Sequence, residues 1–169
     1  MPHQFGGDPG CLGALPAGKV SLGGINIWLA DDSREFCVLF KEYFHNYPDL
    51  NFSQVFHSAI ELIAALKRMP PPDVILLDYQ MPEMNGLEAL PHIRQLAPFA
   101  SVLLVTTFYD LAIQKQALAA GAVAFLRKTE PEIEIISAIR SARAVQSAAM
   151  AAKPAASTVR IDDHSPEPA

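Results

Sequence analysis

The sequence predicts an α/β protein with a single doubly wound domain, in which helices cover both faces of a parallel sheet. Three observations support this class. Short apolar runs alternate five times with stretches of helical periodicity, which is typical of parallel strands joined by right-handed crossovers. The chain has 169 residues, a length that favours one domain with tails. Half of these residues are hydrophobic, which is enough for a sizeable core.

The overall composition argues against several kinds of protein. The net charge of −5 does not suit a strongly basic surface for nucleic acids. Cys11 and Cys37 are too far apart for a metal-ligand cluster or a disulfide framework, and Cys37 lies in an apolar helical pattern that predicts a reduced core thiol. No apolar run reaches about 18 residues, so we expect no membrane span.

The first strand is expected at Ile25–Ala30, a short apolar run that ends at two adjacent acids, Asp31 and Asp32. Residues 1–24 are rich in Gly and Pro without a sustained period, and we expect a disordered leader there. They lack the basic start and the unbroken apolar segment of a signal peptide. The acids at the strand end suit either a helix N-terminus capped by Ser33 or a site for a divalent cation.

The next elements are a helix over residues 33–47, a weaker strand over 51–56 and a helix over 58–69 that Pro70 ends. The apolar spacing predicts two buried faces. The predicted core positions of the first helix are Phe36, Leu39, Phe40, Tyr43 and Phe44, and those of the second are Ile60, Ile63, Ala64 and Leu66.

The third strand, Val74–Leu77, is wholly apolar and is expected to be buried on both faces of the sheet. It ends on a carboxylate, Asp78. A loop with Pro82, Asn85 and Gly86 follows, and then a helix over residues 87–96 that Pro91 should weaken or bend near its start.

Two further strand–helix units complete the pattern. A strand over 101–106 ends at Thr106 and is followed by a helix over 111–120, for which Gly121 is a good C-cap. A strand over 122–126 ends at Arg127-Lys128. The residues 129–132 fit a capping box for a last helix that fades after Val145. We expect a domain over residues 25–145 and a disordered, Ala/Pro-rich acidic tail over 146–169.

The polar residues that stand out in this apolar pattern all lie at or just after the ends of predicted strands. In the flavodoxin-like strand order 2-1-3-4-5, strands one and three are neighbours at the switch point. Asp31, Asp32 and Asp78 should therefore meet, with Thr106 and Lys128 at the ends of the next two strands. Such a cluster of carboxylates suits Mg²⁺. Taken singly, Lys128 would be better explained as a solvated lysine at a strand end, and Thr106 by simple β-propensity.

The segment from Asp78 to Gly86, with Met81-Pro82 between them, resembles the phosphoacceptor segment of response-regulator receiver domains. The resemblance covers residues 25 to about 145. It implies that Asp78 is the phosphoacceptor, assisted by Thr106 and Lys128, and that Thr106 and Phe125 form a switch. The Mg²⁺ ligands that it implies are Asp32, Asp78 and the main-chain carbonyl of Gln80, with Asp31 acting largely through water.

Three positions depart from the family pattern. Thr129 stands where Pro usually follows the lysine, Thr107 where a small residue usually follows the hydroxyl, and Phe125 where Tyr is frequent. None of these departures removes a chemical group that the reaction needs. They affect the backbone near Lys128 and the details of the switch.

The resemblance also implies partners and a setting. The phosphoryl donor would be a sensor histidine kinase or a histidine phosphotransfer protein, and the protein would be a cytoplasmic regulator rather than an enzyme. Residues 146–169 are too few to fold as an output domain, so we expect a stand-alone receiver. A downstream protein would bind the face made by residues 111–120, 122–126 and 131–145. We expect neither direct DNA binding nor membrane contact.

Three alternatives remain open. The chain could be a pseudo-receiver that binds partners without phosphorylation, although the full set of site residues argues against it. It could be a truncated relative of LuxR/NarL-type transcription regulators. A phosphatase of the haloacid-dehalogenase type is disfavoured, because Gln80 stands where that class carries a second aspartate.

Overall fold

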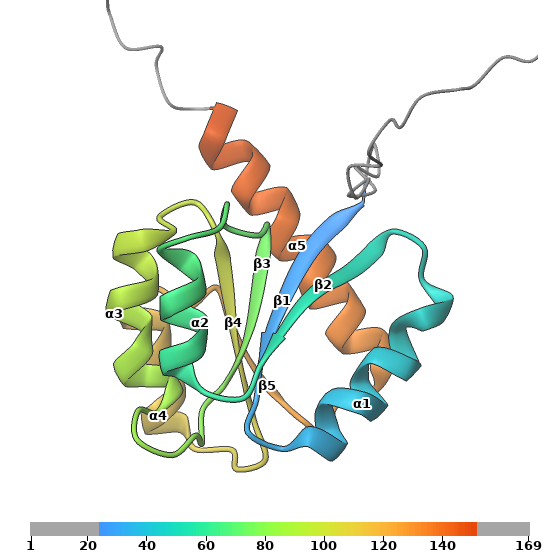
Figure 1. Cartoon of the computed structure of the whole chain (residues 1–169). Coiled ribbons are helices and arrows are strands. Elements are labelled where there is room, and N and C mark those ends of the chain that lie inside the picture. The colour runs from blue at the N-terminus through green and yellow to red at the C-terminus, as the bar shows by residue number, and fades with distance from the viewer. Residues whose placement is uncertain (1–23, 152–169) are drawn as a thin grey trace, which may run out of the picture.

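Five parallel strands form one sheet in the order β2-β1-β3-β4-β5, which confirms the predicted class and strand order (Figure 1). The computed structural model describes residues 24–151, so the predicted leader and most of the predicted tail lie outside the described residues. The strands are β1 (Ile25–Ala30), β2 (Leu50–Phe56), β3 (Val74–Asp78), β4 (Ser101–Thr106) and β5 (Ala124–Arg127). β1 lies between β2 and β3, and the register of β1 with β2 shifts between Ile27 and Trp28.

The helices pack on both faces of the sheet (Figure 1). They are α1 (Arg34–Tyr43), which continues into the short 3₁₀ helix η1 (Phe44–Asn46), α2 (Ala59–Leu66), α3 (Gly86–Leu96), α4 (Leu111–Ala119) and α5 (Glu132–Ala151). Between residues 24 and 151, no helix is both long and apolar enough to cross a membrane.

Each face of the sheet has its own hydrophobic cluster, because successive side chains of a strand point to opposite faces. Ile75 and Leu77 of β3 pack in the cluster beneath α2, α3 and α4. Leu76 packs in the cluster beneath α1 and α5. All five residues of β3 are buried, which confirms the prediction of a strand covered on both sides. Asp78, the last of them, therefore lies at the end of a fully buried strand.

Side-chain caps fix where several helices begin. Ser33 accepts a hydrogen bond from the Phe36 N–H and caps α1, as expected. Asn85 and Glu88 form a capping box at the start of α3. Gly121 follows α4 with a φ of +102°, a conformation that favours glycine and agrees with its predicted role after this helix.

Two predicted helix faces were partly wrong. In α1 the buried residues are Cys37 and Phe40, whereas Leu39 and Tyr43 are 53% and 61% exposed. In α2, Ile60 is 47% exposed, because the face toward the sheet is made by its neighbours Ala59, Leu62 and Leu66. A helix turns by about 100° per residue, so an apolar residue next to the buried stripe lies on the helix flank.

The end of the domain also differs from the prediction. α5 does not fade after Val145 but continues to Ala151, because its last turns are rich in alanine and Gln146 is buried and bound to Arg143. The predicted capping box over residues 129–132 is not formed in the described structure. α5 instead begins after Pro131, and Glu130 pairs with Arg127.

Candidate functional site

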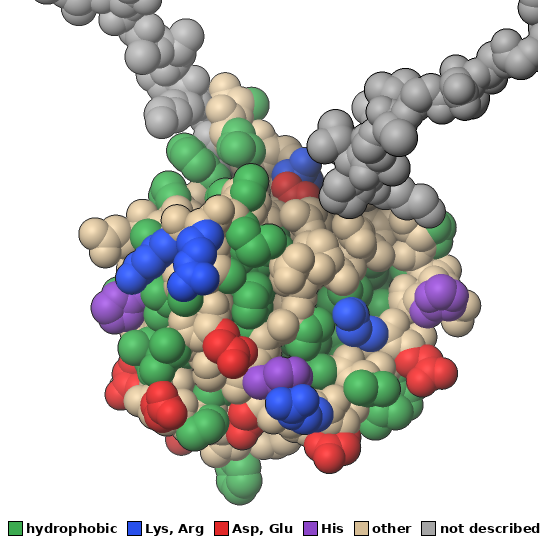
Figure 2. Space-filling view, viewed as in Figure 1, with side chains coloured by type: hydrophobic (Ala, Val, Ile, Leu, Met, Phe, Trp, Pro, Cys, Tyr) green, Lys and Arg blue, Asp and Glu red, His purple; other side chains and the backbone are tan. Residues whose placement is uncertain are grey.

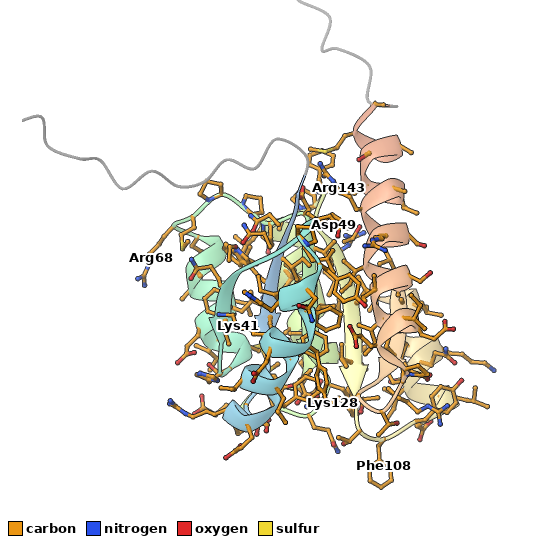
Figure 3. All side chains as sticks on the ribbon, turned by 90° about the vertical axis from the view of Figure 1, so that its right-hand side faces the viewer. Lys41, Asp49, Arg68, Phe108, Lys128 and Arg143 are labelled. Carbon is orange, nitrogen blue, oxygen red and sulfur yellow. The ribbon has the colours of Figure 1, made fainter. Side chains whose placement is uncertain are left out.

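The carboxyl ends of β1, β3, β4 and β5 bring the predicted polar residues to one edge of the sheet. Asp31 directly follows β1, Asp78 ends β3, Thr106 ends β4, and Lys128 directly follows β5. All strands are parallel, so these residues share an edge, and Figure 3 shows Lys128 at this end of the molecule. Their spatial meeting is as predicted. Their chemical roles stay predictions.

Three carboxylates form a compact cluster at this edge. One oxygen from each of Asp31, Asp32 and Asp78 lies within 4.8 Å of the others. Asp31 and Asp78 are buried, whereas Asp32 is exposed. Oδ1 of Asp31 accepts a hydrogen bond from the Ser33 N–H at 3.0 Å, which fixes its orientation. An all-oxygen donor set that is open to solvent at Asp32 fits Mg²⁺, which retains several of its waters when bound.

Lys128 is the only cation that contacts these acids among the described residues. Its Nζ lies 2.6 Å from Oδ2 of Asp31 and 3.2 Å from Oδ2 of Asp78. The ammonium also lies 4.6 Å from the centre of the Phe36 ring, and the Lys128 N–H donates to the Thr106 carbonyl at 2.7 Å. These contacts hold the lysine over the acids. The cation–π contact with Phe36 was missed in the sequence, where Phe36 was expected only as a core residue.

Burial and the mutual contacts of the cluster shift the pKa values of Asp78, Asp31 and Lys128. Burial, followed by the negative charge of Asp31, raises the pKa of Asp78 from 3.8 to about 6, although Lys128 opposes the shift. Burial also raises the pKa of Asp31 against the lowering effect of Lys128. Burial lowers the pKa of Lys128, but its contacts with both acids outweigh this effect and the pKa is raised. Three carboxyl groups face one ammonium group in this cluster, so the site is short of positive charge whenever its acids are ionised.

The loop after β3 positions Asp78 through close backbone contacts. The Gln80 N–H donates to Oδ1 of Asp78 at 3.3 Å, and the Gly86 N–H donates to the Tyr79 carbonyl at 2.9 Å. A Cβ on Gly86 would lie only 2.4 Å from the carbonyl oxygen of Asp78, so this approach requires glycine. Glu83 has a φ of +68°, which shows how tightly the loop turns.

A hydrogen bond joins the loops after β3 and β4 across the mouth of the site. The Thr107 hydroxyl donates to Oε1 of Gln80 at 3.1 Å, and both side chains are exposed. The predicted role of the Gln80 main-chain carbonyl as a metal ligand stays a prediction. Thr107, noted in the sequence only as a departure from the family pattern, thus contacts the loop that carries Asp78.

Thr106 on β4 and Phe125 on β5 lie on neighbouring parallel strands. In their register, Phe125 pairs with Leu104 and Thr106 pairs with Arg127. Thr106 is fully buried, and its hydroxyl oxygen accepts a hydrogen bond from the Phe108 N–H at 3.1 Å. Phe125 is 8% exposed and packs in the cluster beneath α2, α3 and α4. The aromatic ring of the predicted switch therefore points inward.

Tyr109 covers Phe125 and was missed in the sequence. The two rings make an edge contact with centroids 6.2 Å apart, and the guanidinium of Arg127 lies 5.3 Å from the centre of the Tyr109 ring. The Tyr109 hydroxyl donates to Oε1 of Gln114 on α4 at 3.0 Å. Tyr109 thus links Phe125 on β5 to Gln114 on α4. No local pattern identifies such a contact, because it joins a loop to a strand 16 positions further along the chain.

The comparison with known families agrees with this geometry. A model of the family described as "Response regulator receiver domain" matches residues 27–140. The uncharacterized transcriptional regulatory protein YxjL of Bacillus subtilis is 34% identical over 118 residues, which are 70% of this chain and 54% of the relative. The protein-glutamate methylesterase/protein-glutamine glutaminase of Thermotoga maritima is 32% identical over 151 residues, 81% of this chain and 42% of the relative. The chain thus spans about half the length of these curated relatives or less.

Solved structures with the same fold include two receiver domains. The signal receiver domain of the putative response regulator NarL from Mycobacterium tuberculosis is 27% identical, with a TM-score of 0.66 over 72% of this chain and 97% of that one. The response regulator domain of Thermotoga maritima CheB is 29% identical, with a TM-score of 0.64 over the same shares of the two chains.

Proposed function

The chain belongs to the response regulator receiver-domain family, and from that premise we propose that Asp78 accepts a phosphoryl group in a Mg²⁺-dependent reaction. One observation carries the proposal. Two buried acids, an exposed third acid and one lysine converge where four parallel strands end. This arrangement leaves an excess of negative charge, so it suits a divalent cation and then a phosphoryl group that the cation and Lys128 neutralise.

The proposed reaction is a phosphoryl transfer. A carboxylate oxygen of Asp78 forms a bond to phosphorus while the bond from phosphorus to the donor atom breaks, and the product is an acyl phosphate. We propose that Lys128 neutralises one phosphoryl oxygen as a point charge and that the Thr106 hydroxyl donates a hydrogen bond to another. For this, the hydroxyl has to turn toward the phosphoryl group, while its oxygen now accepts from the Phe108 N–H.

The residues present fit Mg²⁺. We propose that Asp32, Asp78 and the main-chain carbonyl of Gln80 would hold the ion, with Asp31 acting through water while it stays paired with Lys128. A bound Mg²⁺ neutralises charge on the transferring group and orients it. The exposure of Asp32 leaves room for the waters that this ion retains.

The phosphoryl donor proposed here is a sensor histidine kinase or a histidine phosphotransfer protein in the cytoplasm. The downstream partner is proposed to bind the face of α4, β5 and α5. Several apolar side chains of these elements and of the turn before β5 are partly exposed in the described structure: Leu111, Leu118, Val123 and Ile133. Such exposed apolar groups support a protein-binding surface. The protein would act as a signalling switch, without turnover of a separate substrate.

The proposed domain is the receiver alone, over residues 25–151 after the correction for α5. The two relatives described above are longer than the part that this chain matches, and the activities in their names are not assigned to these residues.

The phosphoacceptor is tested by incubation with acetyl phosphate and Mg²⁺, followed by intact mass measurement. We expect the wild type to gain one phosphoryl group, and Asp78→Asn to gain none. Asp110→Asn is the matched control, because Asp110 is an exposed acid that caps α4 outside the cluster. If Asp78→Asn is phosphorylated at the wild-type rate, the assignment is wrong. If the wild type gains no phosphoryl group, the chain is the alternative pseudo-receiver.

The switch is tested by amide hydrogen exchange with and without beryllofluoride, a phosphoryl mimic. We expect protection to change at Asp78 and also along α4 and α5, because Thr106, Phe108 and Tyr109 link the site to α4. Thr106→Ala should confine the change to the acid cluster. A wild-type response that never reaches residues 111–120 would contradict the switch.

A further inference from the structure

The opposite face of the domain carries a groove that the proposed function does not use. It lies between α2 and α3, has a volume of about 370 Å³, and is separated from the acid cluster and from the face of α4, β5 and α5. Its apolar lining consists of Ile60, Ile63, Ala64 and Met84. Ile60 is 47% exposed, which is unusual for an isoleucine on a packed helix.

Basic side chains line one end of this groove. Lys67 and Arg68 at the end of α2 and His92 on α3 complete its lining, and all three are exposed. Figure 2 shows the basic side chains together at this end of α2 and α3, and Figure 3 shows Arg68 extending from the surface. Neither Lys67 nor Arg68 has an ion pair with any residue between 24 and 151. The groove therefore suits a ligand with apolar side chains next to carboxylates.

The chain itself contains such a segment beyond α5. The sequence Val159-Arg160-Ile161-Asp162-Asp163 includes the only branched apolar residues of 152–169, followed at once by two acids. In an extended chain, Val159 and Ile161 point to the same side and Arg160 to the other. We propose that Val159–Asp163 docks in the groove between α2 and α3, with the two apolar side chains against its lining and the acids beside Lys67 and Arg68.

The chain can reach the groove. The crossover helices run antiparallel to the strands, so α2 and α5 both end at the amino edge of the sheet (Figure 1). α5 ends at Ala151, eight residues before Val159. Eight extended residues span about 28 Å, comparable with twice the radius of gyration, about 14 Å, of a domain of this size.

A second groove, on the other face of the sheet, is a poorer match for this segment. It lies between α1 and the start of α5 and includes Phe36, Leu39 and Tyr43, but Glu130 and Glu132 also line it. Its one cation, Lys128, is already paired with Asp31 and Asp78. An acidic segment would be repelled there, whereas the unpaired cations at α2 attract it.

A spin label on the full-length chain tests the docking. Ser165→Cys in a Cys11→Ser background provides a single reactive thiol, because Cys37 is buried and burial raises its pKa to about 11. We expect the label to broaden the methyl signals of Ile60, Ile63 and Met84 more strongly than those of Val38 and Leu39 on α1. Equal broadening on both faces would overturn the proposal.

Charge and apolar variants test how the segment is held. Lys67→Glu/Arg68→Glu should lower the docked-to-free ratio about two- to fivefold for each reversed charge, and adding Asp162→Lys/Asp163→Lys in the same chain should restore it. Lys41→Glu, an exposed change on α1, is the matched control and should leave the ratio unchanged. Val159→Ser/Ile161→Ser removes the apolar side chains of the segment and should lower the docked-to-free ratio, with no change in the chemical shifts of the core residues Leu76 and Leu103.

Two further results would overturn the proposal. Broadening of the groove signals that survives both Lys67→Glu/Arg68→Glu and Val159→Ser/Ile161→Ser would show that neither charge nor apolar contact holds the segment. Broadening that passes from labelled chains to unlabelled, isotope-enriched chains in a mixture would show that the groove is occupied by a second copy instead.

Discussion

The two edges of the sheet carry the same kinds of charged residues in opposite arrangements (Figure 3). At the amino edge, Arg143 contacts Oδ1 of Asp73 at 2.6 Å, and the Asn26 N–H donates to the other carboxylate oxygen at 2.8 Å. Nearby, Arg140 binds Asp49 through two hydrogen bonds and lowers the pKa of that acid. Asp73 and Asp49 are thus each paired with a different arginine of α5, and both pairs link this helix to the sheet.

At the carboxyl edge, by contrast, one lysine is shared by two buried acids, with a third acid beside them. Burial and mutual repulsion raise the pKa of Asp78 to about 6, so ionising the cluster at neutral pH costs folding free energy. Satisfied pairs stabilise the fold, whereas an unsatisfied cluster leaves free energy that a ligand can recover. The comparison suggests that the amino edge is structural and the carboxyl edge is the site.

The largest expected effect on stability is at the amino edge. Arg143→Ala should lower the free energy of unfolding by about 2 kcal/mol, because Asp73 keeps only its hydrogen bond from the Asn26 N–H, Gln146 loses its bond to the guanidinium, and α5 loses this link to the residue before β3. Chemical denaturation measures the change, and Arg143→Lys should recover part of it. Phosphorylation by acetyl phosphate should be unaffected. A loss of phosphorylation in the folded variant would show that the amino edge is not purely structural.

At the carboxyl edge, we expect a substitution to raise the free energy of unfolding rather than to lower it. Asp78→Asn should raise the free energy of unfolding of the metal-free protein by about 1 to 2 kcal/mol at pH 7, because it removes one of three crowded negative charges. Denaturation in the presence of a chelator measures it, with Asp110→Asn as the control outside the cluster. Destabilisation by Asp78→Asn would show that the cluster is satisfied without a ligand.

The pH dependence sharpens this prediction. The folded-state pKa of Asp78 is raised from 3.8 to about 6, so between these values the folded protein holds a proton that the unfolded chain releases. The contribution of Asp78 to stability is therefore lost as the pH rises from about 4 to about 6. The gain from Asp78→Asn should be small near pH 4 and complete above pH 6. A gain that is constant across this range would exclude charge crowding as its cause.

A smaller effect is expected on metal binding. Asp32→Ala should weaken Mg²⁺ binding about tenfold, or about 1.4 kcal/mol, because the cluster loses its exposed carboxylate. Titration calorimetry measures the affinity, and Asp110→Asn again serves as the control. Unchanged affinity in Asp32→Ala would remove this acid from the site.

The smallest effect on the free energy of unfolding is expected at the amino edge, for the exposed pair of Arg140 and Asp49. Arg140→Ala should cost less than about 1 kcal/mol, because Arg140 and Asp49 are 47% and 40% exposed and water screens their attraction. The loss should shrink further at high salt. If Arg140→Ala lowers the free energy of unfolding more than Arg143→Ala does, burial does not determine which ion pair of this edge stabilises the fold more.

Much of the fold followed from local pattern. The apolar run before Asp78, the alternation of strands and helices and the turn residues Gly86 and Gly121 depend on periodicity and backbone preference, which neighbouring residues determine. The meeting of Asp31, Asp78 and Lys128 followed as well, because parallel strands in the order 2-1-3-4-5 place their carboxyl ends together. The sequence therefore determined the class, the strand order and the acid cluster.

Only the tertiary structure decided which helix faces are buried and which side chains meet across elements. Leu39 and Ile60 are apolar and helical in spacing, yet they lie on helix flanks that the sheet does not cover. The contacts of Tyr109 with Phe125 and of Arg143 with Asp73 join residues that are distant in the chain. Such contacts depend on the rotation of each helix and the path of each loop, which the packing of the whole domain sets and no local period records.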